Sequence, residues 1–266
     1  MNDHELARHL AVTAGTLLSG LRQHAESFTE ESDQELLALA KEVLGKAGDG
    51  AGHDYLTSQL ALLRGEDEVL SEEGDGTETA RLHAERVWIV DPLDGTSEYS
   101  SHRSDYAIHV ALWERSSTMP SQLVAASVAV PELGVVWSMD DVPVASPSDD
   151  RPIRILVSRS RPPREIEDIS ANLTEAFPLR GVEVVPMGSV GAKVGHILAG
   201  HADMYINTGG FYEWDLAAPL GVAVHHGLQV FDVKGQEFTF NNANPKLSGA
   251  IVTRPEFASI VLSSIA

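Results

Sequence analysis

The chain has 266 residues and carries 39 acidic side chains against 19 Lys and Arg, a formal net charge of -20 at pH 7. This balance excludes a general binder of nucleic acid polymers or of an anionic membrane, because both need a basic surface. The absence of cysteine excludes disulfides and Cys-ligated metal centres. No apolar run approaches the roughly 18 residues that a membrane span needs, and the first residues lack the basic start of a signal peptide. We therefore expect a cytoplasmic protein.

The N-terminal quarter predicts helices. Apolar side chains recur at intervals of three or four residues from Leu6 to Leu21, which places them on one face of a helix. The same spacing predicts helices over residues 31–44 and 54–64. Between these two, residues 45–52 contain four glycines, a composition typical of turns, so we expect a loop there.

Strands and a boundary follow. Runs rich in Val, Ile and aromatic residues predict strands over residues 87–90, 106–112, 123–130 and 134–139. Pro131 marks a hairpin turn between the last two. The polar segment 140–151, interrupted by prolines, predicts a boundary between an N-terminal sub-domain of residues 1–145 and a C-terminal sub-domain of residues 146–266.

The C-terminal half alternates strands with helices. In chain order we expect strand 153–157, helix 165–176, strand 182–186, helix 190–199, strand 204–206, helix 215–226, strands near Val230 and Ile251, and a closing helix 256–265. The alternation indicates an α/β class, while the earlier hairpin argues against a purely parallel sheet.

Two carboxylates stand at the end of a predicted strand. Asp91 and Asp94 follow residues 87–90 directly, in an Asp-Pro-Leu-Asp-Gly-Thr run. Side chains at the carboxyl end of a strand project into the crevice where α/β proteins bind ligands. Gly95 permits close backbone approach, and a helix starting at Thr96 would turn free N–H groups toward an anion. The run predicts a site for a cation and a phosphate, although an ordinary acidic turn explains two Asp residues equally well.

Three more acids extend this pattern. Glu72 belongs to a pair of acids that follows Leu70, Asp215 opens an apolar helix, and Asp49 lies among the glycines. The simpler interpretations are a helix cap for Asp215 and a solvated turn residue for Asp49. The spacing of the strand-end acids does not fit an Asp-x-Asp phosphatase nucleophile, and the chain lacks a P-loop and a Gly-x-Ser-x-Gly elbow.

Together these motifs resemble a known family. Residues 88–96 resemble the Asp-Pro-Ile/Leu-Asp-Gly-Thr signature of the inositol monophosphatase superfamily of Mg²⁺-dependent, lithium-sensitive phosphatases. Residues 71–73 and 214–218 look like its Glu-Glu and Trp-Asp-x-Ala motifs. Segments 157–163 and 188–193 are similar to the bacterial CysQ type, the 3′(2′),5′-bisphosphate nucleotidases that convert 3′-phosphoadenosine-5′-phosphate (PAP) to AMP and phosphate. The resemblance implies an αβαβα sandwich like that of inositol monophosphatase and fructose-bisphosphatase, a site between two sub-domains, and a homodimer.

The resemblance also implies a metal centre of two to three Mg²⁺ ions. Its expected ligands are four carboxylates and one backbone carbonyl: Glu72, Asp91, Leu93, Asp94 and Asp215. Asp49, Thr96 and Glu72 are the expected catalytic residues, with Asp49 and Thr96 orienting the attacking water. Mg²⁺ favours oxygen ligands of this kind. Because metal-activated water needs no protein nucleophile, we expect direct attack on phosphorus without a phosphoenzyme.

Substrate contacts are implied for a set of glycine, hydroxyl and charged residues: Gly95, Thr96, Ser97, Gly188, Ser189, Lys193, Glu213 and Arg159. Ser97 departs from the Lys or Arg expected in many CysQ proteins, which puts a bisphosphate preference in doubt. Solvent exposure explains Lys193 equally well, and a surface loop explains Arg159 and Arg161. His225 and His226 resemble a metal pair, but adjacent helical residues diverge by roughly 100°, so we interpret them as structural.

Several functions stay open at this point. PAP hydrolysis in sulfate assimilation and nucleotide recycling is the preferred one, with inositol monophosphatase or fructose-1,6-bisphosphatase activity as alternatives. A different class is a catalytically silent metal- or anion-binding protein on the same fold. A two-carboxylate glycosidase would need no metal. The expected partner is a small-molecule phosphate ester. Its binding depends on bound Mg²⁺ ions, because the carboxylates alone would repel a phosphate.

Overall fold

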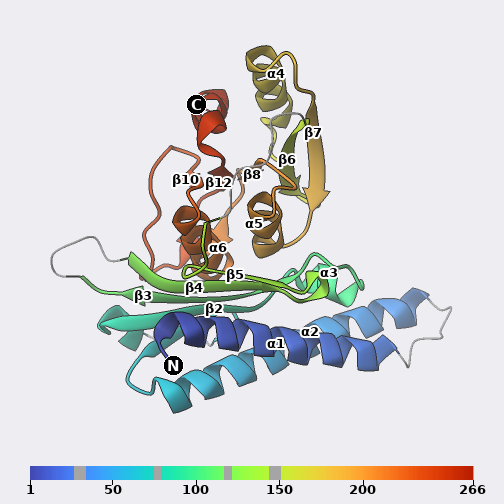
Figure 1. The fold of residues 1–266 in the computed structure, drawn as a ribbon. Helices are drawn as coiled ribbons and strands as arrows, with labels where there is room; N and C mark the ends of the chain where they lie inside the picture. Colours follow the sequence, from blue (N-terminus) through green and yellow to red (C-terminus); the bar gives the residue numbers. More distant parts are fainter. Residues whose placement is uncertain (27–33, 75–78, 117–121, 144–150, 266) are drawn as a thin grey trace.

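The computed structural model describes residues 1–26, 34–74, 79–116, 122–143 and 151–265. These residues build two five-stranded sheets with helices outside and between them, so that five layers follow one another through the molecule (Figure 1). This order of layers is the predicted αβαβα sandwich.

The first sheet comprises β1 (Glu68–Ser71), β2 (Arg86–Asp94), β3 (Ala107–Glu114), β4 (Gln122–Val130) and β5 (Val135–Ser138), in that spatial order. β1 runs parallel to β2, and the other neighbours are antiparallel. The predicted strands and the hairpin at Pro131 are confirmed. β1, at the edge of the sheet, was not predicted.

Helices α1 (Asp3–Glu26) and α2 (Gln34–Leu63) cover the outer face of this sheet (Figure 1). The expected loop over residues 45–52 is wrong, because α2 runs through it without interruption. A Cβ at Gly48 would come within 2.8 Å of Leu93 Cδ2, and one at Gly52 within 2.9 Å of Pro92 Cβ. The glycines therefore let the helix approach the end of β2 closely. The predicted helix start at residue 31 lies outside the described residues.

The second sheet comprises β6 (Ile153–Ser158), β7 (Val182–Met187), β8 (Met204–Asn207), β10 (Gln229–Asp232) and β12 (Ala250–Thr253), in the order β10-β12-β8-β6-β7. α4 (Ile166–Ala176) and α7 (Ala258–Ile265) lie on its outer face, and α5 (Val190–Leu198) and α6 (Glu213–His225) lie between the two sheets (Figure 1). Small elements complete the site region: α3 (Thr96–Ser100), β9 (Phe211–Tyr212) and β11 (Lys246–Leu247).

Strand alternation distributes apolar side chains among three cores. In β2, Trp88 and Val90 pack with α1 and α2, whereas Val87 and Ile89 face the central helices. α6 is buried from residue 216 to residue 223, as expected for a helix that is apolar all round. No helix in the described ranges is long and apolar enough to cross a bilayer.

The predicted sub-domain boundary between residues 145 and 146 lies outside the described residues, and the division stays a prediction. α5 and α6 come from the second half of the chain but pack against the sheet of the first half. The loops before these two helices therefore face the end of β2, where the predicted site residues lie.

Candidate active site

Three carboxylates converge where β2 meets α6. Asp91 and Asp94 lie at the end of β2, and Asp215 lies in the first turn of α6. One carboxylate oxygen of each lies within 4.8 Å of the others. The pairing of β2 with β3 shifts its register between Asp91 and Asp94, around Pro92, which cannot donate a ladder hydrogen bond. Three of the five predicted ligands therefore lie together, and their role as metal ligands stays a prediction.

Asp91 is the most deeply buried of the three, with 1% of its surface exposed. Its Oδ1 accepts a hydrogen bond from Leu93 N at 3.0 Å, while Oδ2 has no hydrogen-bond partner in the described part of the chain. Burial, and then the charges of Glu72, Asp94 and Asp215, raise the pKa of Asp91 well above its usual value. A buried carboxylate oxygen without a donor, surrounded by other acids, is the chemical environment that a cation would stabilise.

Glu72 and Asp215 complete the acidic group. Glu72 follows β1 directly and is exposed, and its carboxyl group lies close enough to Asp215, Asp49 and Asp94 for their charges to act on it. Burial of the carboxyl group, followed by the charge of Asp215, raises the pKa of Glu72 to about 7. Burial and the charge of Asp94 raise the pKa of Asp215 to about 7, against the opposing hydrogen bond that Tyr212 N donates at 2.6 Å. Crowding of like charges thus extends over the whole group.

Asp49 and Thr96 lie together, as predicted. Thr96 Oγ1 is 3.1 Å from Asp49 Oδ1 and 3.3 Å from the carbonyl oxygen of Leu93, so its one proton is shared between two acceptors. Burial raises the pKa of Asp49 to about 6. Asp49 reaches this position from the helix α2 and not from the loop we expected.

A cavity of about 380 Å³ opens beside the carboxylates. Asp94 and Asp215 form part of its wall, together with these predicted substrate residues: Gly95, Thr96, Ser97, Arg159, Gly188, Ser189 and Lys193. The exposed Arg161 also lines it, and the guanidinium of Arg161 has no hydrogen bond or ion pair within the described ranges. The ring of Tyr212, 38% exposed, stacks on Trp214 with centroids 4.6 Å apart at the rim of the cavity.

The ammonium group of Lys193 is hydrogen-bonded to backbone carbonyl groups. Lys193 is 3% exposed, and its Nζ donates to the carbonyls of Met187 (3.3 Å), Gly188 (2.9 Å) and Ser189 (2.7 Å). Burial lowers the pKa of Lys193 to about 8. The side chain holds the loop before α5 in place, which corrects the solvent-exposed interpretation, while a contact with substrate stays a prediction.

Arg159 lies in the cavity wall but is already paired. Its guanidinium donates to Glu98 Oε1 at 2.5 Å and to Asp105 Oδ2 at 2.6 Å, and Asp105 also accepts from Gly188 N at 2.6 Å. A Cβ at Gly188 would lie 2.3 Å from the Glu98 side chain. These contacts tie the α3 region to the loop before α5, and a phosphate would have to share Arg159 with two carboxylates.

Glu213 corrects a further expectation. It is fully buried, and its carboxylate accepts hydrogen bonds from Asn241 N at 2.6 Å and from the backbone and side chain of Asn242 at 2.8 Å each. Glu213 does not line the cavity. Its contacts anchor the start of α6 and leave no role as a sugar-hydroxyl acceptor.

Ser189, expected from the sequence in a different role, binds Asp94, and His109, which the sequence did not indicate, lies beside Asp94. Asp94 Oδ2 accepts from Ser189 Oγ at 2.6 Å, Val190 N at 2.5 Å and Gly191 N at 3.2 Å, at the start of α5. Ser189 adopts a left-handed φ of 42°, rare for a residue other than glycine. Its hydroxyl therefore positions Asp94. His109, in β3, lies with Nε2 3.3 Å from Asp94 Oδ2. Only the strand register, which pairs His109 with Asp91, could have indicated this.

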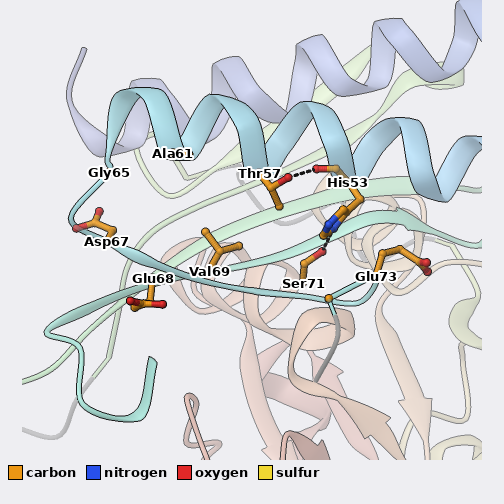
Figure 2. A pocket seen from close by; sticks show the side chains of 10 residues that line it. His53, Thr57, Ala61, Gly65, Asp67, Glu68, Val69, Ser71 and Glu73 are labelled. Carbon is orange, nitrogen blue, oxygen red and sulfur yellow. Dashed lines mark hydrogen bonds between the residues drawn. The ribbon is translucent and has the colours of Figure 1, made fainter. Parts of the chain in front are cut away.

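A second cavity, of about 560 Å³, lies between α2 and the edge strand β1 (Figure 2). His53 Nδ1 and Ser71 Oγ lie 2.9 Å apart across it, and Asp67 and Glu73 lie toward its two ends (Figure 2). None of the predicted substrate residues lines this cavity. Its position beside the turn that carries Glu72 makes it a neighbour of the acidic group and not a part of it.

The paired histidines have structural contacts, in line with our interpretation. His226 is buried, and its Nε2 lies 3.3 Å from the carbonyl oxygen of Ser138. His225 Nε2 lies 3.0 Å from the carbonyl oxygen of Asp141. Both rings bind backbone at the end of β5 and the residues after it.

Comparison with known proteins gives a consistent result. Residues 3–263 match the model of the inositol monophosphatase family. The 3′-phosphoadenosine 5′-phosphate phosphatase of Mycobacterium bovis is 39% identical over 227 residues, 84% of this chain and 82% of that protein. The protein of the same name from Mycobacterium leprae is 36% identical over 273 residues, 100% of this chain and 94% of that one. The crystal structure of CysQ from Bacteroides thetaiotaomicron superposes with a TM-score of 0.71 at 24% identity, covering 95% of this chain and 97% of that one.

Proposed function

Since the chain belongs to the inositol monophosphatase family and is a phosphatase, we propose that it is a Mg²⁺-dependent phosphomonoesterase that hydrolyses PAP to AMP and phosphate. The observation that carries the proposal is the convergence of Asp91, Asp94 and Asp215 within 4.8 Å, beside a 380 Å³ cavity that Asp94 and Asp215 line. The names of the mycobacterial relatives support PAP as the substrate. From the family resemblance we also propose a role in sulfate assimilation.

The acidic group fits divalent cations on its own chemistry. It offers hard oxygen ligands, one of them buried without a donor among the described residues. Burial, followed by the neighbouring negative charges, raises the pKa of Glu72 and of Asp91. We propose the following ligands for two to three Mg²⁺ ions: Glu72, Asp91, the Leu93 carbonyl, Asp94 and Asp215. When bound, the ions supply positive charge that neutralises phosphate oxygens and acidifies water.

The protein's own part in the reaction is to hold the water and the phosphate ester. We propose that Asp49 and Thr96 orient the attacking water, with the Asp49 carboxylate accepting its proton. The N–H groups around Gly95 and Ser97 would orient the phosphate. Arg161 lines the cavity, is exposed, and its guanidinium has no partner in the described ranges. We propose that Arg161 binds the second phosphate.

The test is a phosphate-release panel with PAP, inositol 1-phosphate and fructose 1,6-bisphosphate, in Mg²⁺, in EDTA, and in Mg²⁺ with Li⁺. We expect loss of activity in EDTA, inhibition by Li⁺, and kcat/KM for PAP at least about tenfold above the others, which is about 1.4 kcal/mol of discrimination. A smaller preference would favour the inositol phosphate or fructose bisphosphate alternatives. Mg²⁺ binding without turnover would favour the silent binding protein.

Two further parts of the proposal have tests of their own. Direct water attack predicts inversion at a chiral phosphate, and retention would indicate a phosphoenzyme. From the family resemblance we also propose a cytoplasmic homodimer, and light scattering on the purified chain would decide between monomer and dimer.

A further inference from the structure

A buried histidine that the proposed reaction does not use lies beneath the acidic group. His109 is the third residue of β3, is fully buried, and stands opposite Asp91 in the pairing of β2 with β3. Its Nε2 is 3.3 Å from Asp94 Oδ2, and its Nδ1 is 3.9 Å from Asp91 Oδ2. One imidazole therefore contacts both carboxylates of β2.

The His109 ring also contacts α6, the helix that carries the third carboxylate, Asp215. His109 Nδ1 lies 3.2 Å from the carbonyl oxygen of Trp214, the residue before Asp215. A carbonyl can only accept, so Nδ1 carries the proton in this hydrogen bond. Nε2 then faces Asp94 and has no hydrogen-bond partner among the described residues. His109 thus links β3 to the start of α6 while its other nitrogen lies against β2.

The packing around His109 leaves room for an imidazole and little more. A Cβ at Gly191 would lie 2.3 Å from His109 Nε2 and 2.8 Å from Ala107 Cβ. Gly191 N also donates to Asp94 Oδ2 at 3.2 Å. The close approach of α5 to β3 therefore requires glycine at position 191. The helix packs directly against the His109 ring, on the side where Gly191 also contacts Asp94.

We propose that His109 is a positioning residue that sets the spacing of the metal ligands, by holding the Trp214 carbonyl, and with it Asp215, at a fixed distance from Asp91 and Asp94. The inference rests on the proposed function, because it takes these carboxylates as Mg²⁺ ligands. A purely packing role would need only the volume of the ring, and an apolar side chain of similar size would then serve equally well.

The experiment compares variants of the full chain, stripped of metal with EDTA and dialysed. Affinity is measured by titration with Mn²⁺, a paramagnetic stand-in for Mg²⁺, following the free ion by EPR, and each variant's thermal unfolding midpoint is recorded. His109→Leu keeps the bulk and removes the donor, whereas His109→Asn keeps a donor near the Nδ1 position. His226→Leu is the matched control, since His226 is also buried between the sheets and also binds a backbone carbonyl.

We expect His109→Leu to weaken Mn²⁺ binding about 10- to 100-fold, the range typical of residues that orient metal ligands. His109→Asn should stay within about threefold of the unaltered protein, and His226→Leu should lose thermal stability without losing affinity. Unchanged affinity in His109→Leu, or an equal loss in His226→Leu, overturns the inference.

Two further outcomes are decisive. If His109→Leu does not fold, His109→Met takes its place, because its flexible apolar side chain also removes the donor and adapts to the surrounding packing; at least about fivefold weaker Mn²⁺ binding supports the inference and unchanged binding overturns it. If the unaltered protein binds no Mn²⁺, the proposed function fails and this inference with it. Normal binding by the unaltered protein together with normal binding by the variants refutes the role of His109 alone.

Discussion

Replacing Gly52 by Ala tests whether glycine at this position of α2 is needed for the helix to pack closely against the end of β2. An added Cβ would lie 2.9 Å from Pro92 Cβ and 3.2 Å from the Pro92 carbonyl oxygen, both closer than ordinary contact. Pro92 stands between Asp91 and Leu93, and its backbone cannot rotate out of the way. α2 or the end of β2 must therefore move by a few tenths of an ångström.

Gly50 supplies the matched control. It lies in the same helix two residues away, and a Cβ there meets nothing within 4 Å. Gly→Ala in a helix interior gains about 1 kcal/mol from helix propensity, and overpacking costs about 1–3 kcal/mol. Gly50→Ala should therefore gain about 1 kcal/mol, which is about 2–4 °C in the unfolding midpoint. Gly52→Ala should range from no gain to a loss of about 2 kcal/mol.

Thermal unfolding and phosphate release on the two variants complete the test. Movement of the end of β2 misplaces Asp91 and the contact between Asp49 and Thr96, so we expect Gly52→Ala to lose about tenfold or more in kcat. Gly50→Ala should keep full activity. If Gly52→Ala gains as much stability as Gly50→Ala and stays fully active, close approach of the helix is not why these glycines are present.

Other predictions concern charge and specificity. Asp94→Asn should reduce PAP hydrolysis by about 10³-fold, since it removes charge where cation binding is worth several kcal/mol, and full activity would remove Asp94 from the ligand set. Without metal, the folded protein binds more protons than the unfolded chain between pH about 4 and 7, because Glu72 and Asp215 have pKa values raised to about 7. The stability that these two groups contribute is therefore present at low pH and lost as the pH rises through 7. We expect the thermal unfolding midpoint in EDTA to fall from pH 5 to pH 8, and Mg²⁺ to restore it. A midpoint that rises over this range would contradict the crowding of negative charge. Tyr212→Ala should raise KM for PAP about tenfold and leave inositol 1-phosphate unaffected, because stacking of a base on an aromatic ring contributes about 1–3 kcal/mol; equal effects on both substrates would refute base stacking on Tyr212.

Periodicity predicted most of the fold, and its failures have physical causes. β1 has four residues at a sheet edge and pairs in parallel with β2, so its short sequence carries no alternation long enough to detect. The segment 45–52 was expected to be a loop because glycine disfavours a helix interior. In α2 the glycines lower the helix propensity but allow close contact with Leu93 and Pro92. This contact is a tertiary requirement, which a local sequence pattern does not reveal.

The acids of the site were predictable because motif residues follow strand ends and open helices. The hydrogen-bond partners of the basic residues could not be predicted from the sequence. Arg159 pairs with Glu98 and Asp105, more than fifty positions away, and Lys193 donates to carbonyl groups, which every residue carries. His109 stands in an apolar run that looks like ordinary core, and only the register of two strands brings it to the carboxylates.

Because α6 fills the space between the sheets and carries Asp215, the acidic group is assembled late in biosynthesis. A ribosome-bound chain that has not yet released residue 215 already contains Asp49, Glu72, Asp91 and Asp94, yet it lacks the ligand that closes the cluster. Nascent chains therefore carry four of the acids without the fifth, and the acidic group is complete only when roughly the last fifth of the polypeptide has docked. A translation product truncated before α6 would be an inactive protein with a crowded, uncompensated patch of carboxylates.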